Sequence, residues 1–533
     1  MRKIGKKTIC IALALTMLAS GCLTGCNSGN ATSSDTVSSG TQSTGSSAGE
    51  KDSQKISIEI MSNAWVGTAR GNNDPYKAWL DKTFNVDAKL TASTNFKDQI
   101  MVRVSSGDVP DIIAPGDKNL MLSLYDEGVL LDDWNKYKKQ VPTIFKEMNE
   151  TAQKGATVDG KLAFISQLED QNDWSWKIRK DWLHNLGLKT PTTPEELLDV
   201  ARKFTNNDPD KDGKNDTYAF TSAGGKTGVG EINELGFMWG PVGFYLGDDK
   251  KVNNWILDGN CKKWLDYMRE IVKEKLIDPD WYTIGWEDRK PKLFKGTYGI
   301  CWYPSVIVGE CEGGTGATGK TVGWWEDMPT PKGSETGGII GANNPYASMR
   351  TISADAEKDP DKLDRLLQIF ESVEYPNKGY YQLRWGVDCD KFVLKDAGDG
   401  YKFINSKTAH KGINQRLPDS NQGLWDWGCW IGCGYADKVL ETGSDEMDDA
   451  CRAQLNMIKT TASMKKMSDA NSLFTFDNTI STQLSTIEAA FEYKYINGQT
   501  DDYSGFQKNW LGAGGQKLLD AAQKQAKTLG LTK

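Results

Sequence analysis

The chain is poor in the residues and motifs that many enzymes use for chemistry. It has 533 residues but only two histidines, and it contains no HExxH motif. No CxxC pair is present, so the common zinc signature is missing too. A glycoside hydrolase needs only two carboxylates about 5 to 10 Å apart. The 72 Asp and Glu residues therefore leave that class open, but we predict that the protein is not an enzyme.

The sequence also lacks a basic excess and repeated apolar runs. Its formal net charge of -8 argues against nucleic acid as a partner, because phosphate binding needs a basic face. A mean hydropathy of -0.55 argues against several membrane spans. The abundant residue is tryptophan, with 19 copies. Tryptophan fills cores, and it also offers flat apolar faces to a ligand such as a sugar ring.

The first 25 residues have the pattern of a bacterial export signal. Four basic residues precede an apolar stretch from Thr8 to Leu18, which is short for a membrane helix. The signal leads into "LTGC", residues 23–26, which resembles the lipobox at which exported lipoproteins are cut and acylated. We therefore predict lipidation at Cys26. Cys22 is the weaker candidate because Ala19 stands where Leu is usual, and the alternative is a soluble secreted protein with a chance cysteine.

Residues 26–54 are rich in Ser, Thr and Gly and have almost no apolar side chain. Such a segment cannot bury enough surface to offset the entropy lost on ordering, so we predict a disordered tether. Together with the lipid it places the folded part, residues 55–533, on the outer face of the cell membrane. The membrane is then a partner only through the anchor.

Cysteine use gives no disulfide framework. Seven cysteines follow Cys26, an odd number, so at least one is unpaired. They are Cys261, Cys301, Cys311, Cys389, Cys429, Cys433 and Cys451.

The start of the folded part alternates strand and helix patterns. We predict strands over 55–63, 85–93 and 109–116, and helices over 74–84 and 95–108. This alternation is typical of an α/β layer with a largely parallel sheet, whose ligands lie beyond the carboxyl ends of the strands. The loops 62–74 and 114–119 should therefore lie on the binding side.

The later chain shows clearer helix punctuation. We expect a helix over 174–191 that ends at Gly187. A second helix starts with Thr193 as N-cap and Glu196 at the third helical position. Further on, 296–305 is β-like, and 361–373 and 480–496 are helical.

The stretch "NNDPDKDGKNDTY", residues 206–218, has the spacing of a calcium loop. Side chains would come from Asp208, Asp210, Asp212 and Asp216 and a carbonyl from Lys214, with Gly213 at the turn. Ala219 stands where a calcium-sensing EF-hand needs a bidentate Glu. We therefore predict a structural Ca²⁺ rather than a sensor. The alternative is an Asp-rich turn without metal.

Several phrases together resemble one protein family. They are "DVPDII", "GVLLDDW", "IRKDWLHNLGLKTPTTPEELLDVARKFTNNDPDKDGKND", "RWGVDCDKFVL" and "YINGQTDDYSGFQKNWLGAGGQKLLDAAQ". They are similar to the large extracellular solute-binding lipoproteins of sugar ABC importers, in the LipO-like and alginate-oligosaccharide-binding subgroup. The resemblance runs from about Ile56 to Lys533, and its calcium-loop phrase is the most specific.

The resemblance implies a fold and a function. The fold would be α/β and two-lobed, like a periplasmic binding protein. Each lobe would be a mostly parallel sheet flanked by helices, with the ligand cleft at the hinge. Lobe 1 would comprise about 55–170 and 325–390, and lobe 2 about 171–324 and 391–533. The protein would capture an oligosaccharide and deliver it to an ABC transporter permease, and we expect a monomer. In the alginate-binding relatives the loop holds a structural Ca²⁺, but Thr217 here replaces a Glu that completes their coordination.

Aromatic and polar residues in loops are the candidate sugar contacts, because C–H patches of sugar rings pack on aromatic faces. Each single aromatic can instead belong to the core. The candidates are Asn63, Trp65, Asp117, Trp174, Arg179, Trp239, Trp302, Tyr303 and Trp385. Besides the hydrolase, a lipid-anchored glycan adhesin without a permease is the alternative function.

Overall fold

The computed structural model describes residues 55–63, 74–169, 173–315, 321, 323–385, 394–405 and 438–532. Contacts along the chain group Ser53–Lys533 into one compact unit. The predicted lipidation site Cys26 and the tether lie outside the described residues. Within the described part, no helix is both long and apolar enough for a membrane crossing.

The first five-stranded sheet has the order β2-β1-β3-β13-β6. Its strands are β1 (Ile56–Asn63), β2 (Val86–Ser93), β3 (Ile112–Ala114), β6 (Ile165–Glu169) and β13 (Asn344–Ile352). β1 pairs parallel with β2 and β3, whereas β13 pairs antiparallel with β3 and β6. One strand, β13, therefore runs against the other four. The three strands predicted at the start of the folded part are confirmed.

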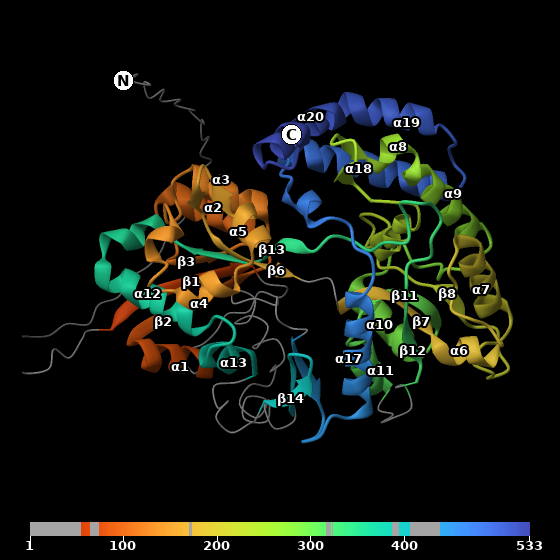
Figure 1. Cartoon of the computed structure of the whole chain (residues 1–533), viewed down its shortest axis with the longest axis horizontal. Coiled ribbons are helices and arrows are strands. Elements are labelled where there is room, and N and C mark those ends of the chain that lie inside the picture. The colour runs from red at the N-terminus through yellow and green to blue at the C-terminus, as the bar shows by residue number, and fades with distance from the viewer. Residues whose placement is uncertain are drawn as a thin grey trace, which may run out of the picture. The chain divides into compact units, whose positions relative to one another are not determined.

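One apolar core joins this sheet to its helices. In Figure 1, α2 and α3 lie above the strands and α1 and α13 below them. The helices that contribute to this core are α1 (Pro75–Phe84), α2 (Phe96–Ser106), α3 (Lys118–Asp126), α4 (Pro142–Glu147), α5 (Glu150–Gly155), α12 (Pro360–Ser372) and α13 (Lys378–Trp385).

The second, four-stranded sheet has the order β12-β7-β11-β8. Its strands are β7 (Trp174–Arg179), β8 (Tyr218–Phe220), β11 (Tyr298–Pro304) and β12 (Trp325–Met328). β11 pairs parallel with β8, and β7 pairs antiparallel with both β11 and β12. Again a single strand, β7, opposes the rest. β12 lies in this sheet although residues from about 325 were predicted in lobe 1, so the chain returns to the first sheet only at β13. The remaining lobe boundaries stay a prediction.

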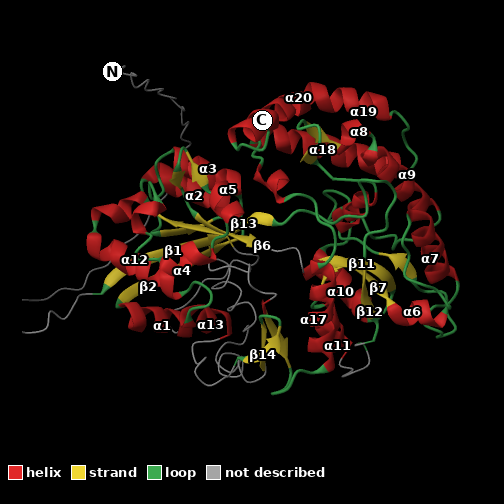
Figure 2. Cartoon of the chain, viewed as in Figure 1, coloured by secondary structure: helices red, strands yellow, loops and turns green. Residues whose placement is uncertain are grey.

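Helices surround the second sheet as well, as the red ribbons of Figure 2 show. They are α6 (Lys180–Asn185), α7 (Pro194–Asn206), η3 (Gly230–Met238), α8 (Trp255–Asp258), α9 (Asn260–Lys273), α10 (Trp286–Phe294), α11 (Ile307–Thr315), α17 (Asp449–Ala462), α18 (Asn478–Ile496), α19 (Tyr503–Trp510), the π-helical turn η8 (Leu511–Gly515) and α20 (Gln516–Thr528). The α/β fold class is thus confirmed.

The remaining elements are short. They are the strands β4 (Thr157–Val158), β5 (Lys161–Leu162), β9 (Phe244–Leu246), β10 (Val252–Asn254), β14 (Lys395–Gly398), β15 (Tyr401–Asn405) and β16 (Val439–Thr442), and the helical turns η1 (Trp134–Tyr137), η4 (Ala354–Lys358) and η7 (Asp469–Leu473).

The predicted helix over 174–191 is wrong in its first half. Residues 174–179 form strand β7, and only Lys180–Asn185 are helical. Every residue of β7 after Trp174 is buried. Two of them are charged, Lys177 and Arg179, and each finds a carboxylate, Asp327 and Asp181 respectively. These ion pairs, one local and one across to β12, therefore allow a strand whose sequence carries charge into the core.

The predicted helix with Thr193 as its N-cap is confirmed, but the Glu196 carboxylate has a different partner from that of a capping box. The Thr193 hydroxyl accepts the Glu196 N–H at 3.2 Å, as an N-cap should. The Glu196 carboxylate reaches back to the N–H and hydroxyl of Thr192, both at 2.8 Å, and not to Thr193. The helix that precedes the acidic loop is therefore firmly fixed at its start.

Candidate functional site

The carboxyl edge of the first sheet brings two predicted residues together. Asn63 ends β1, and the turn after β3 contains Gly116 and Asp117. A Cβ on Gly116 would lie 2.4 Å from the Asn63 amide nitrogen, so glycine makes room for that side chain. The Asp117 carboxylate caps α3 by accepting the Leu120 N–H at 2.9 Å. Asn63 and Asp117 are both exposed.

The basic residue beside Asp117 is directed elsewhere. The Lys118 ammonium donates to the carbonyls of Ser472, at 3.4 Å, and Phe474, at 2.5 Å. It also lies 4.3 Å from the centre of the Tyr346 ring. Burial lowers the pKa of Lys118 to about 8, against the effect of the Asp117 charge. Lys118 thus ties α3 to the segment before α18.

The carboxyl edge of the second sheet carries a second group. Trp174 begins β7 opposite Pro304, the last residue of β11. Just before it, Asp173 accepts hydrogen bonds on Oδ1 from the N–H of Ser305, at 3.2 Å, and from its hydroxyl. Asp173 and Trp174 are both half-buried. Burial raises the pKa of Asp173, while the hydrogen bonds from Ser305 lower it.

Trp286 completes this edge and was missed at the sequence level. It begins α10, and its ring centre lies 5.6 Å from that of Trp174. It stacks on Tyr303 at 4.8 Å with an interplanar angle of 15°. Gly285 precedes it, but nothing local indicates that it meets Trp174. Its role depends on how α10 packs beside β11.

The other predicted contacts lie in different places. Trp239 and Trp302 are 8% and 7% exposed and belong to the second core, and Tyr303 has no exposed surface. Arg179 is at the far end of β7 from Trp174, about 17 Å away for five strand residues. The predicted helix over 174–191 would have placed Arg179 little more than one turn from Trp174, and the strand does not. Its guanidinium binds Asp181.

Two predicted contacts cannot be placed. Trp65 lies outside the described residues, and Trp385 ends α13 with a side chain that also lies outside them. The ligand roles of all nine candidates stay predictions.

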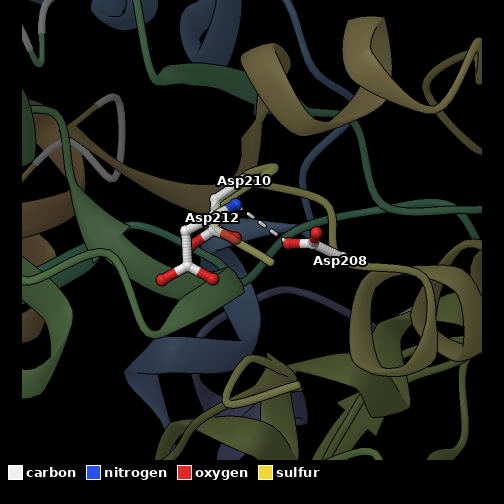
Figure 3. A group of neighbouring side chains, drawn as sticks. All are labelled: Asp208, Asp210 and Asp212. Carbon is white, nitrogen blue, oxygen red and sulfur yellow. Dashed lines mark hydrogen bonds between the residues drawn. The ribbon is translucent and has the colours of Figure 1, made fainter. Parts of the chain in front are cut away.

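The acidic loop forms a compact group of carboxylates after α7. Oxygens of Asp208, Asp210 and Asp212 lie within 4.8 Å of one another. Asp208 accepts the N–H of Asp212 at 3.1 Å, the dashed line in Figure 3, and that of Gly213 at 3.0 Å. Gly213 has a φ of 83°, which suits glycine. The loop is therefore wrapped so that its first carboxylate closes it.

The charges of the loop are unevenly compensated. Burial and the neighbouring Asp212 and Asp208 raise the pKa of Asp210. The Lys214 ammonium, 2.6 Å from Asp212 Oδ2, lowers the pKa of Asp212. Asp216 is exposed and lies outside the compact group. The oxygen-only donor set fits a hard divalent cation such as Ca²⁺.

Thr217 and Ala219, the two positions at which an expected Glu ligand is replaced, are buried. The Thr217 hydroxyl donates to the Phe204 carbonyl at 2.8 Å, and Thr217 is buried. Ala219 is fully buried in β8. Neither residue supplies a ligand from these buried positions, so beyond the predicted Asp216 side chain any further ligands must come from carbonyls or water.

Comparisons with known proteins come from sequence and from structure. No family model matches the chain. It is 25% identical to the polygalacturonan/rhamnogalacturonan-binding protein YtcQ of Bacillus subtilis over 58% of this chain and 61% of YtcQ. It is 23% identical to the lipoprotein LipO of the same species over 78% of this chain and 79% of LipO. The chain thus spans less than two thirds of YtcQ.

A solved structure covers more of the chain. An EF-hand mutant of the substrate-binding protein FusA of Streptococcus pneumoniae, bound to fructo-nystose, has a TM-score of 0.65 and 18% identity. It covers 90% of this chain and all of FusA. The chain therefore has the fold of the two-domain solute-binding proteins. Two of its sequence relatives are named for sugar binding: YtcQ, and FusA, a fructooligosaccharide ABC transporter substrate-binding protein that is 26% identical over 41% of this chain and 44% of FusA.

Proposed function

We propose that the protein captures an oligosaccharide outside the cell and delivers it to an ABC importer permease. The observation that carries this proposal is the pair of carboxyl edges, each with polar or aromatic side chains, in a fold shared with sugar-binding proteins. The ligand would be held between the two sheets, at the ends of their strands. No chemical change of the ligand is required.

Lipidation of Cys26 and the tether over 26–54 would keep the protein at the outer face of the cell membrane. The name of the relative LipO, a lipoprotein, supports this part of the proposal. A protein held in this way would act as a monomer close to its permease.

A thermal-shift screen of residues 55–533 against neutral and acidic oligosaccharides tests the function. A ligand at about 100 times its Kd adds about 2.7 kcal/mol to the free energy of unfolding. We expect one class of glycan to raise the melting temperature and to be recovered intact. A cleaved glycan would instead favour a hydrolase. Binding without closure, measured by small-angle scattering, would favour an adhesin.

We further propose that the loop of Asp208, Asp210, Asp212, Asp216 and the Lys214 carbonyl holds a structural Ca²⁺. An EF-hand in FusA, named in the structure of its mutant, supports this proposal. The ion would neutralise carboxylates that otherwise repel one another and would fix the turn between α7 and β8.

Removing calcium should destabilise the protein without removing the sugar site. With Ca²⁺ at about 100 times its Kd, the free energy of unfolding should exceed that in EDTA by about 2.7 kcal/mol. Asp208→Asn should abolish this difference, because Asp208 is part of the carboxylate group and also closes the loop. Asp126→Asn, at the exposed end of α3, is the matched control and should keep it. An equal response of both variants to EDTA would contradict the assignment.

A further inference from the structure

Asp173 is an oriented carboxylate with one oxygen left over. Both hydrogen bonds from Ser305 go to Oδ1, and no partner of Oδ2 is found among the described residues. Ser305 is fully buried and its backbone also pairs with Asp173, with its N–H 2.8 Å from the Asp173 carbonyl. The side chain therefore has little freedom to turn away. The next residue in the chain is Trp174, which is half-buried.

An oriented acceptor beside an aromatic ring suits a sugar. The ring packs against the C–H face of the pyranose or furanose, and the carboxylate accepts one or two hydroxyl hydrogens. The ring of Trp174 contacts that of Trp286, with 5.6 Å between their centres, and Trp286 stacks on the buried Tyr303. The aromatic face is therefore held by side chains of two further elements.

The positive charges near this edge are already neutralised. Lys177 pairs with Asp327, and both side chains are buried. Arg289, fully buried, pairs with Glu231 at 3.3 Å and lies 4.2 Å from the ring centre of Trp286. Neither cation has exposed surface to offer a ligand.

The carboxylates near this edge are less well compensated. Glu234, on η3 after β8, is half-buried, and burial together with Glu231 raises its pKa to about 7. At the first sheet, Asp117 is exposed while its neighbour Lys118 is bound to carbonyls. Lys290, 5.8 Å from the ring centre of Trp286, pairs with Glu287 at 3.1 Å. The described cations named at the two edges are therefore each bound to carboxylates or carbonyls.

Resting on the proposed function, we propose that Asp173 and Trp174 form a sugar subsite that selects neutral rings over uronate rings. A neutral ring donates hydroxyl hydrogens to the free Asp173 oxygen. A uronate ring brings a second negative charge to a partly desolvated carboxylate, and the described cations nearby, Lys177, Arg289 and Lys290, are already paired with carboxylates of the protein. The relatives do not decide this point, because YtcQ is named for acidic pectic polymers and FusA for fructooligosaccharides.

Calorimetry on residues 55–533 tests the selectivity directly. The probes are neutral oligosaccharides (kestose and gluco-, manno- and xylo-oligomers) and oligogalacturonate of the same length. We expect a neutral probe to bind at least about tenfold more tightly than oligogalacturonate. Tighter binding of oligogalacturonate overturns the inference and leaves the proposed function standing. Binding of no glycan overturns both.

Two variants test the named residues with the neutral probe that binds. Asp173→Asn keeps the size of the side chain but removes its charge, and should weaken neutral binding about 10- to 100-fold while narrowing the gap to oligogalacturonate. Trp174→Ala should weaken binding by at least about tenfold. Asp126→Asn and Trp79→Ala, the latter half-buried on α1, are the matched controls. If neutral binding is unchanged in Asp173→Asn, or if the controls lose as much affinity, the inference fails.

Discussion

Asp327→Ala is expected to lower the free energy of unfolding by about 3 to 5 kcal/mol, because it leaves a buried ammonium without its counter-charge. Lys177 lies directly opposite Asp327 across the β7–β12 pair, and their side chains are 0% and 2% exposed. The Asp327 carboxylate also accepts the hydroxyls of Ser175, at 2.7 Å, and Thr461, at 3.3 Å. The substitution therefore removes an acceptor from three polar groups in the core, and Lys177 and Ser175 keep only their hydrogen bond to each other.

Urea denaturation measures this effect, and two comparisons make it specific. Asp199→Ala breaks an exposed pair with Lys203 and should cost no more than about 1 kcal/mol. The double variant Lys177→Met and Asp327→Leu replaces the pair with apolar side chains and should be more stable than Asp327→Ala alone. If the single and double variants lose the same stability, the cost does not come from the stranded charge.

The same ion pair explains why one element could not be predicted. In β7, Trp174, Trp176 and Ile178 alternate with polar residues, which is a strand period. The charged residues at the other positions argue against a strand that is buried on both faces. Asp327, the partner of Lys177, lies 150 residues away in the chain, so its contribution is invisible locally. The strands β1, β2 and β3 were predictable because β1 and β2 alternate apolar with polar residues and β3 is a short apolar run.

The two candidate sites differ for the same reason. The acidic loop takes its carboxylates from a few consecutive residues, so spacing alone predicts the group around Asp208. The proposed sugar subsite takes Asp173 from just before β7, Trp174 from the start of β7, Ser305 from just after β11 and Trp286 from α10. Sequence indicated Trp174 as an aromatic in a loop, but only the sheet order brings it to Ser305 and Trp286. Trp302 and Tyr303 had the same local pattern and are buried in β11.

A buried carboxyl pair on α18 makes the stability depend on pH. Glu488 and Glu492 are four residues apart and so share one helix face. The indole N–H of Trp510 lies 2.5 Å from Glu488 Oε1, and Glu492 is 9% exposed. Burial, and secondarily the charge of Glu488, raise the pKa of Glu492 to about 8. Cys261 on α9 also lies near this pair, and burial raises the pKa of its thiol.

The sign of the pH effect follows from this shift. Below about pH 4, Glu492 is protonated in both the folded and the unfolded chain and costs nothing. As the pH rises, the unfolded chain releases the proton first, so the free energy of unfolding falls until the folded state also ionises near pH 8. The stabilising protonated form is thus fully present at low pH and lost through pH 8.

Glu492→Gln should therefore stabilise the protein at pH 8 by on the order of 2 to 4 kcal/mol and have little effect at pH 4. Urea denaturation of both proteins at several pH values between 4 and 9 measures the difference. Glu335→Gln, at a side chain that is 99% exposed, is the control and should follow the unmodified protein at every pH. A gain in stability that is the same at pH 4 and pH 8 would show that Gln improves packing and that no proton is involved. An unchanged pH profile in Glu492→Gln would show that this carboxyl is ionised in the folded chain. Only a Glu492 that stays protonated in the folded chain makes folding take up a proton between pH 4 and pH 8.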